Sequence, residues 1–145
     1  ATDEVGAAFK AASISTFGGN PVSMAATNAT LAVMQRENVP ARAGKLGVIL
    51  RAKLEEYKEM FPFIGEVRGL GLMQAIEIVT DRTSKKPDPA RTSEIMELSK
   101  TFGLLLGKGG LYGNTLRIAP PMLISEDDLG DGLARLRKSL EKIPS

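Results

Sequence analysis

Two short stretches of the sequence carry residues that could hold anions. Residues 15–21 read Ser-Thr-Phe-Gly-Gly-Asn-Pro, which places a hydroxyl and two glycines just before an expected helix start. Free backbone N–H groups at a helix N-terminus suit a phosphate. About a hundred positions later Arg117 ends a short apolar strand, where its guanidinium could hold a carboxylate through two parallel hydrogen bonds. The two stretches therefore predict one phosphate site and one carboxylate site.

Each stretch also has a simpler interpretation. Gly-Gly-Asn-Pro suits any turn that leads into a helix, because Asn20 is a good N-cap and Pro21 fits the first helical position. A single arginine at a strand end is more often a structural ion-pair residue than a ligand-binding one. Neither stretch alone establishes a site.

The glycine-rich segment 107–114 does not match a nucleotide-binding loop. Its spacing, Gly-x-Gly-x-x-x-Gly, is one residue off the dinucleotide fingerprint, and a strand rather than a helix is expected after it. We predict a hairpin connection, with a substrate-lining loop as the alternative. Lys108 is expected to be a solvated loop lysine rather than a Schiff-base lysine.

Two charged residues of the extended region 66–79 have structural interpretations. Arg68 lies beside a glycine and is expected to pair with carboxylates or carbonyls. Glu77 stands in an otherwise apolar run, so it either pairs with a base across the sheet or points to water. Neither residue implies catalysis.

The composition excludes several kinds of site. The 145-residue chain has no cysteine and no histidine, which removes disulfides, Cys/His metal sites and Ser-His-Asp triads. The formal net charge is +2, from 19 basic and 17 acidic residues spread along the chain, so we expect no nucleic-acid partner. No apolar run approaches the roughly 18–20 residues of a membrane span, so we expect a soluble, cytoplasmic protein.

Hydrophobic periodicity predicts several helices and a small sheet. One helix is expected to begin at Pro21, and Pro40 either begins a second helix or bends the first. Further helices are expected to include 95–102 and to run from 125 to 143, with extended segments at 66–79, 104–106 and 115–118. This order favours an α+β fold in which helices cover one face of a three- or four-stranded sheet.

Several motifs together resemble one enzyme family. STFGGNP before an Ala-rich helix, then VRGLGLM, YGNTLRIAPP and ISEDDL, follow the order and approximate spacing of the class III aminotransferases, which depend on pyridoxal phosphate (PLP). The resemblance runs from about Ile14 to Ile143, and the wording GKGGLYGNTLRIAPPM is most similar to the alanine–glyoxylate type. Agreement of several motifs in order is far more specific than any one of them.

The resemblance implies a fold and a set of binding residues. It implies the mostly antiparallel small C-terminal domain of fold type I PLP enzymes, in a homodimer that moves amino groups between amino acids and 2-oxo acids. Thr16, Phe17 and Gly18 would contact the phosphate of the partner subunit's PLP, and Arg117 would bind the substrate carboxylate. The implied divisions are an entry segment at 1–20, linking helices at 21–62 and a small α+β domain at 63–145.

The family's Schiff-base lysine precedes the STFGGNP motif, and no residue before that motif here fits the role. We therefore expect the chain to correspond to the C-terminal part of such an enzyme, with no catalytic residue of its own and no activity alone. Two other readings remain: a stand-alone module that binds a small anion, and an interaction domain that uses the 46–61 helix as an oligomer face.

Overall fold

The computed structural model describes residues 2–12 and 14–144, which divide into two compact units, 1–37 and 38–145. The first unit contains helices α1 (Asp3–Ala8) and α2 (Pro21–Arg36), and no residue of either helix is buried. The helix start expected at Pro21 is confirmed. Asn20 caps it, because its Oδ1 accepts a hydrogen bond from the Ser23 N–H at 2.9 Å.

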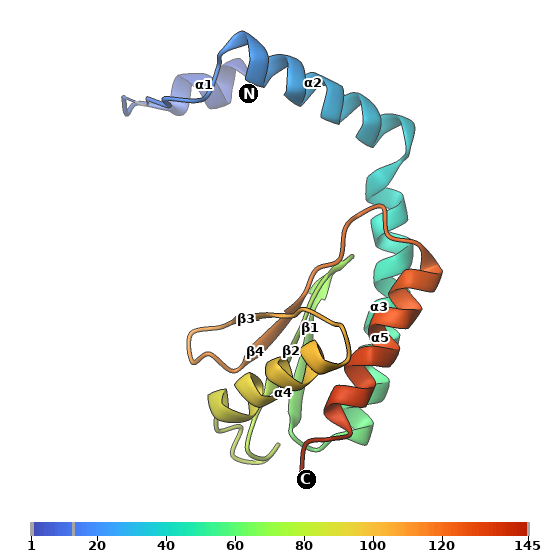
Figure 1. Ribbon diagram of the computed structural model, residues 1–145. Helices are drawn as coiled ribbons and strands as arrows, with labels where there is room; N and C mark the ends of the chain where they lie inside the picture. Colours follow the sequence, from blue (N-terminus) through green and yellow to red (C-terminus); the bar gives the residue numbers. More distant parts are fainter. Residues whose placement is uncertain (1, 13, 145) are drawn as a thin grey trace. The chain divides into compact units, whose positions relative to one another are not determined.

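The second unit is an α+β structure around a four-stranded sheet (Figure 1). Its elements, in chain order, are α3 (Val39–Met60), β1 (Ile64–Leu70), β2 (Met73–Ile78), α4 (Pro89–Thr101), β3 (Gly107–Gly109), β4 (Thr115–Ile118) and α5 (Glu126–Leu140). The strands lie in the order β1-β2-β4-β3, and each neighbouring pair is antiparallel. This confirms the predicted fold class.

The two faces of the sheet differ in character because side chains alternate along each strand. Ile76 and Ile78 of β2 and Leu116 of β4 are fully buried in a core shared with the helices. Glu77 and Arg117, which alternate with them, are not buried. The helices therefore cover one face, and the other face carries the charged residues; we call the latter the open face.

The helix ends follow the signals in the sequence. Ser125 caps α5, since its Oγ accepts from the Asp128 N–H at 3.0 Å and donates to the Asp128 carboxylate at 2.7 Å. Gly103 follows α4 with a φ of 74°, the left-handed conformation that suits a glycine after a helix. Both helix boundaries were predicted.

Two strand predictions differ from the structure. The extended region 66–79 is a hairpin of two strands that turns at Gly71, whose φ is 54°. The strand expected at 104–106 is wrong: Leu105 is 83% exposed, and the strand that pairs with β4 is β3, three residues later. The three leucines at 104–106 suggested a buried strand, but the residues that pair with β4 are those of the glycine-rich segment 107–109.

Helix α3 packs with the sheet as one unit. Leu46, Leu50, Leu54 and Tyr57 lie on its buried side, and the Tyr57 hydroxyl donates to the Leu133 carbonyl of α5 at 3.0 Å. The divisions 1–20, 21–62 and 63–145 remain predictions. In this structure α3 belongs to the compact unit that begins at Asn38.

Helix α3 approaches the β1–β2 turn closely at Gly47. A Cβ at this position would lie only 2.4 Å from the carbonyl carbon of Gly71 in the β1–β2 turn. Gly44, one helical turn earlier, has nothing within 4 Å of an added Cβ. The two glycines of α3 therefore provide a matched pair of substitution sites, one against backbone and one in open space.

We expect Gly47→Ala to lower the free energy of unfolding of this chain by about 1–3 kcal/mol, because the added methyl overpacks a backbone contact. Gly44→Ala should instead raise it by about 1 kcal/mol, the difference in helix propensity between glycine and alanine. Urea unfolding followed by circular dichroism measures both. Equal stability of the two variants would show that α3 does not approach the turn this closely.

Candidate functional site

The antiparallel register brings residues far apart in the sequence into rows on the open face. Ala75 of β2 pairs with Arg68 of β1 on one side and with Arg117 of β4 on the other. Arg117 in turn pairs with Gly107 of β3. Two arginines therefore lie in one row with the small Ala75 side chain between them.

The next row holds the carboxylates that neutralise Arg68. The Nη1 of Arg68 donates to Glu77 at 2.6 Å and to Glu66 at 3.0 Å. The Nη2 of Arg68 donates to the Thr115 hydroxyl at 3.2 Å. Asn114 donates to the other Glu77 carboxylate oxygen at 3.1 Å. The expectation that Arg68 is a structural partner of carboxylates is confirmed, and of the two alternatives for Glu77, pairing with a base is correct.

The charges in this cluster reinforce one another. Partial burial raises the pKa of Glu77, but the hydrogen bonds from Arg68 and Asn114 and the charge of Arg68 outweigh it, so the pKa lies below its ordinary value. The hydrogen bond to Glu77 in turn raises the pKa of Arg68. Both groups stay charged at neutral pH and bind each other.

Arg117 has a different environment from Arg68. Its side chain is exposed, and among the residues that the structure describes none forms a hydrogen bond or ion pair with it. The stem lies beside β3, where an added Cβ at Gly109 would be 3.3 Å from the Arg117 Cδ. Of the two arginines in the row, only Arg117 has its hydrogen-bond donors available to a ligand.

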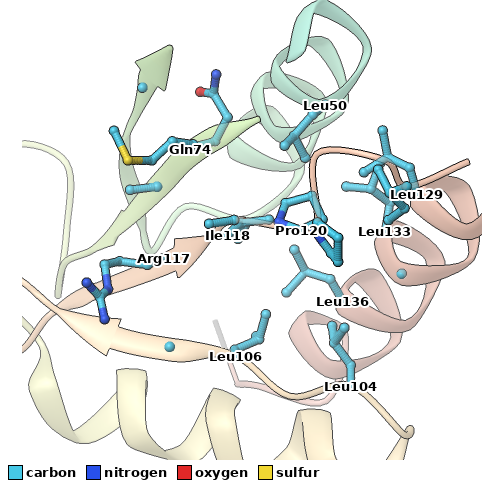
Figure 2. A pocket seen from close by; sticks show the side chains of 18 of the residues that line it. Leu50, Gln74, Leu104, Leu106, Arg117, Ile118, Pro120, Leu129, Leu133 and Leu136 are labelled. Atoms are coloured by element: carbon cyan, nitrogen blue, oxygen red, sulfur yellow. The ribbon is translucent and has the colours of Figure 1, made fainter. Parts of the chain in front are cut away.

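An apolar cavity of about 860 Å³ adjoins this arginine. Besides Arg117, its lining includes leucines of the segment before β3 and of α5, namely Leu104, Leu106, Leu129, Leu133 and Leu136. Figure 2 shows that the guanidinium points away from these leucines. The charge therefore avoids the apolar wall and faces the open side of the sheet, as a group that is costly to desolvate should.

Lys108 lies between the two glycines of β3 but belongs to the other face. Its Nζ donates to the Ser93 hydroxyl at 2.7 Å and to the Pro89 carbonyl at 3.2 Å, both near the N-terminus of α4. It was predicted to be a solvated loop lysine; it is exposed, but it ties the edge strand to α4. The predicted hairpin connection is confirmed, since β3 pairs with β4.

The STFGGNP segment lies in the first unit and forms a closed turn before α2. The Ser15 hydroxyl accepts from the Gly18 N–H at 3.0 Å, and the Phe17 carbonyl accepts from the Asn20 amide at 2.7 Å. The Gly18 N–H, which we expected to face an anion, is thus used within the turn. Phe17 is 84% exposed, and the Thr16 hydroxyl has no acceptor within the described part of the chain.

Of the three residues expected to contact a phosphate, Thr16 keeps its hydroxyl unbonded within the described residues, whereas the Gly18 N–H is bonded inside the turn. The structure places Thr16, Phe17 and Gly18 in one unit and Arg117 in the other. Sequence reasoning missed the roles of Thr115 and Asn114 in holding Arg68 and Glu77. Only the strand register, which was not predicted, brings them together.

Comparison with known proteins identifies the family. Residues 1–140 match the family model for aminotransferase class-III. The chain belongs to the class III aminotransferases. A curated relative, the mitochondrial alanine–glyoxylate aminotransferase 2 homolog 2 of Arabidopsis thaliana, is 46% identical over 113 residues, which cover 78% of this chain and 24% of the relative. The chain thus spans about a quarter of that class III enzyme's length.

Solved structures of an aminotransferase and of an amine transaminase share the fold. A Bacillus anthracis aminotransferase matches 97% of this chain and 34% of its own length, with a TM-score of 0.85 and 31% identity. An amine transaminase from an uncultivated Pseudomonas species, solved in a PLP-bound form, covers 87% of this chain and 28% of its own, with a TM-score of 0.79 and 30% identity. PLP is the cofactor of the class III family.

Among the described residues of this chain, no helix has the length and apolar character needed to cross a membrane. No group of three or more acidic side chains in the same residues could hold a metal ion.

The Arg68–Glu77 pair predicts a pH-dependent stability. Because folding lowers the pKa of Glu77, its carboxylate stabilises the fold at neutral pH, and this contribution is lost as the pH falls through the folded-state pKa. Glu77→Gln should cost about 1–3 kcal/mol near pH 7, because it removes a charged hydrogen bond to Arg68. The deficit relative to the native chain should shrink below about pH 4.

Thermal melts of both chains between pH 3 and pH 7 measure this deficit. Glu66→Gln is the matched control: it removes a carboxylate from the same arginine, but one whose side chain is 57% exposed against 27% for Glu77. Its effect should be smaller. A Glu77→Gln deficit that did not change with pH would assign the loss to packing rather than to charge.

Proposed function

We propose that this chain is the C-terminal part of a PLP-dependent aminotransferase that moves an amino group between an amino acid and a 2-oxo acid. The observation that supports it best is the contrast within one row of the open face. Arg68 is bound by two carboxylates, whereas Arg117 keeps its donors exposed in a chain of the class III family. Arg117 is the residue we assign to the substrate carboxylate.

The physical basis of this assignment is the shape of the guanidinium. Its planar fork can donate two parallel hydrogen bonds to a carboxylate, which fixes the orientation of the substrate as well as its position. Pro120 and Pro121 follow one residue after β4 and restrict the backbone there. Glu66 and Glu77 lie in the neighbouring row, but Arg68 holds both, so they do not compete for Arg117.

The cofactor phosphate is assigned to the turn before α2. There the Thr16 hydroxyl would donate to it, with Phe17 and Gly18 shaping the turn. PLP, when bound, supplies the electron sink for the transfer of the amino group. The chain's own residues bind and orient: Thr16 the cofactor, Arg117 the substrate. We further propose that the full-length protein is a homodimer in which Thr16 serves the partner's cofactor, that it is cytoplasmic, and that this chain alone is inactive.

The alternative of a stand-alone anion-binding or regulatory module has less support. Its basis was the arginine beside a glycine-rich loop. That loop is a strand-forming hairpin, and the curated relative and the solved structures described above are named as enzymes. The aminotransferase proposal accounts for both stretches at once.

We expect Arg117→Ala, in the full-length protein, to lower kcat/KM for an amino acid donor roughly 30- to 1,000-fold, which corresponds to losing about 2–4 kcal/mol of bidentate binding. Lysine should restore little, because it lacks the planar fork. A donor amine without a carboxylate should be affected much less. Single-turnover conversion with each donor alone measures this difference. The 2-oxo acid is left out because its own carboxylate would also bind Arg117.

Lys108→Ala is the control for loss of a positive charge, because Lys108 lies in the same hairpin but on the helix-covered face. It should not distinguish the two donors. If Arg117→Ala slowed both donors equally, or lowered the thermal melting temperature enough to explain the loss, Arg117 would be structural and the assignment wrong.

Thr16→Ala should weaken PLP retention in the full-length protein without abolishing the reaction. One hydrogen bond to a charged phosphate contributes about 1.5–3 kcal/mol, so we expect the dissociation constant to rise roughly 10- to 150-fold. Equilibrium dialysis measures it. Thr30→Ala removes a hydroxyl that bonds only within α2, to the Ala26 carbonyl at 2.9 Å, and should leave the affinity unchanged. Equal affinity of both variants would contradict the phosphate role.

A further inference from the structure

The edge strand β3 has glycine at both positions that face the open side of the sheet. Gly107 and Gly109 are not among the glycines with positive φ, so their backbone accepts any L-residue. Gly110 and Gly113 in the same hairpin differ, with φ values of 81° and 63°. The turn explains the second pair of glycines, but backbone conformation does not explain the first.

The Arg117 side chain does explain the glycine at position 109, because it occupies the space above that residue. A Cβ at Gly109 would lie 3.3 Å from the Arg117 Cδ and 3.4 Å from its Nε. Carbon atoms pack best at about 3.5–4.0 Å, so a side chain at 109 requires Arg117 to move. A Cβ at Gly107 would lie 3.7 Å from the same Nε, an ordinary contact.

The neighbouring residues fix this arrangement from both sides. Lys108 holds β3 to the N-terminal end of α4, so the glycine strip has a defined position relative to the sheet. Across β4, Ala75 separates Arg117 from Arg68, and Arg68 is held in its own row by Glu66 and Glu77. The stem of Arg117 therefore lies against the glycines of β3, and an added Cβ would be nearer to it at Gly109 than at Gly107.

We infer that Gly109 is a positioning residue for Arg117. Because it has no side chain, the arginine stem can lie across β3 in the rotamer that presents the guanidinium to a substrate carboxylate. Gly109 itself touches neither substrate nor cofactor. This inference rests on the proposed function, because it concerns the same carboxylate site and adds a determinant of specificity for carboxylate-bearing donors.

The test compares Gly109→Ala with Gly107→Ala in the full-length protein, using single-turnover conversion of an amino acid donor and of a carboxylate-free amine. Gly109→Ala should raise KM for the amino acid about three- to tenfold, the effect of forcing a side chain off its preferred rotamer, with little change in the maximal rate. The carboxylate-free amine should be converted as before. Gly107→Ala should stay within about twofold for both donors.

A double variant separates positioning from folding. In an Arg117→Ala background, Gly109→Ala should not change KM for the amino acid donor any further, because the arginine side chain that it would displace is absent. If Arg117→Ala shows the donor discrimination but Gly109→Ala does not, the inference is wrong and the proposed function stands. If Gly109→Ala impairs both donors equally, or acts additively with Arg117→Ala, its effect is on the fold and the inference is also wrong. If Arg117→Ala itself fails to discriminate, the proposed function falls and the inference falls with it.

Discussion

The pairing of β4 between β2 and β3 is the constraint on which the charged face depends. It sets Arg117 opposite Ala75 on one side and opposite Gly107 on the other, and it sets Thr115 opposite Glu77. A slip of one residue in this register would turn Arg117 into the core and bring Leu116 to the open face. The core itself opposes such a slip, because Leu116 is fully buried with Ile76 and Ile78. Hydrophobic packing on one side of the sheet thus fixes the electrostatics of the other.

Two arginines in one row differ in their hydrogen bonding because of what surrounds them. Arg68 satisfies its donors with two carboxylates and a hydroxyl, which makes it part of the scaffold. Arg117 faces small residues and keeps its donors exposed. The same side-chain type is structural at one position and available for binding at the other, and only the three-dimensional neighbours distinguish them.

The sequence was sufficient for the features that depend on local chemistry. Asn20 before Pro21, and Ser125 three residues before Asp128, predicted two helix starts because a cap needs only its own helix. The Arg68 expectation followed from its place beside a glycine, and the Glu77 expectation followed from a charge in an otherwise apolar run. The strand at 104–106 was misplaced, and the roles of Asn114 and Thr115 were missed, because these depend on which strands pair. The family motifs supplied the assignment of Thr16 and Arg117, which periodicity alone did not.

The bare glycine strip of β3 has a consequence for how such a protein could change during evolution. Every glycine codon is one nucleotide from codons for alanine and valine, and the backbone at position 109 accepts both. The preference for a donor could therefore drift through a single base change at a residue that never meets the substrate. Arg117 would remain in the sequence throughout, so its presence alone would not reveal that the selectivity had altered.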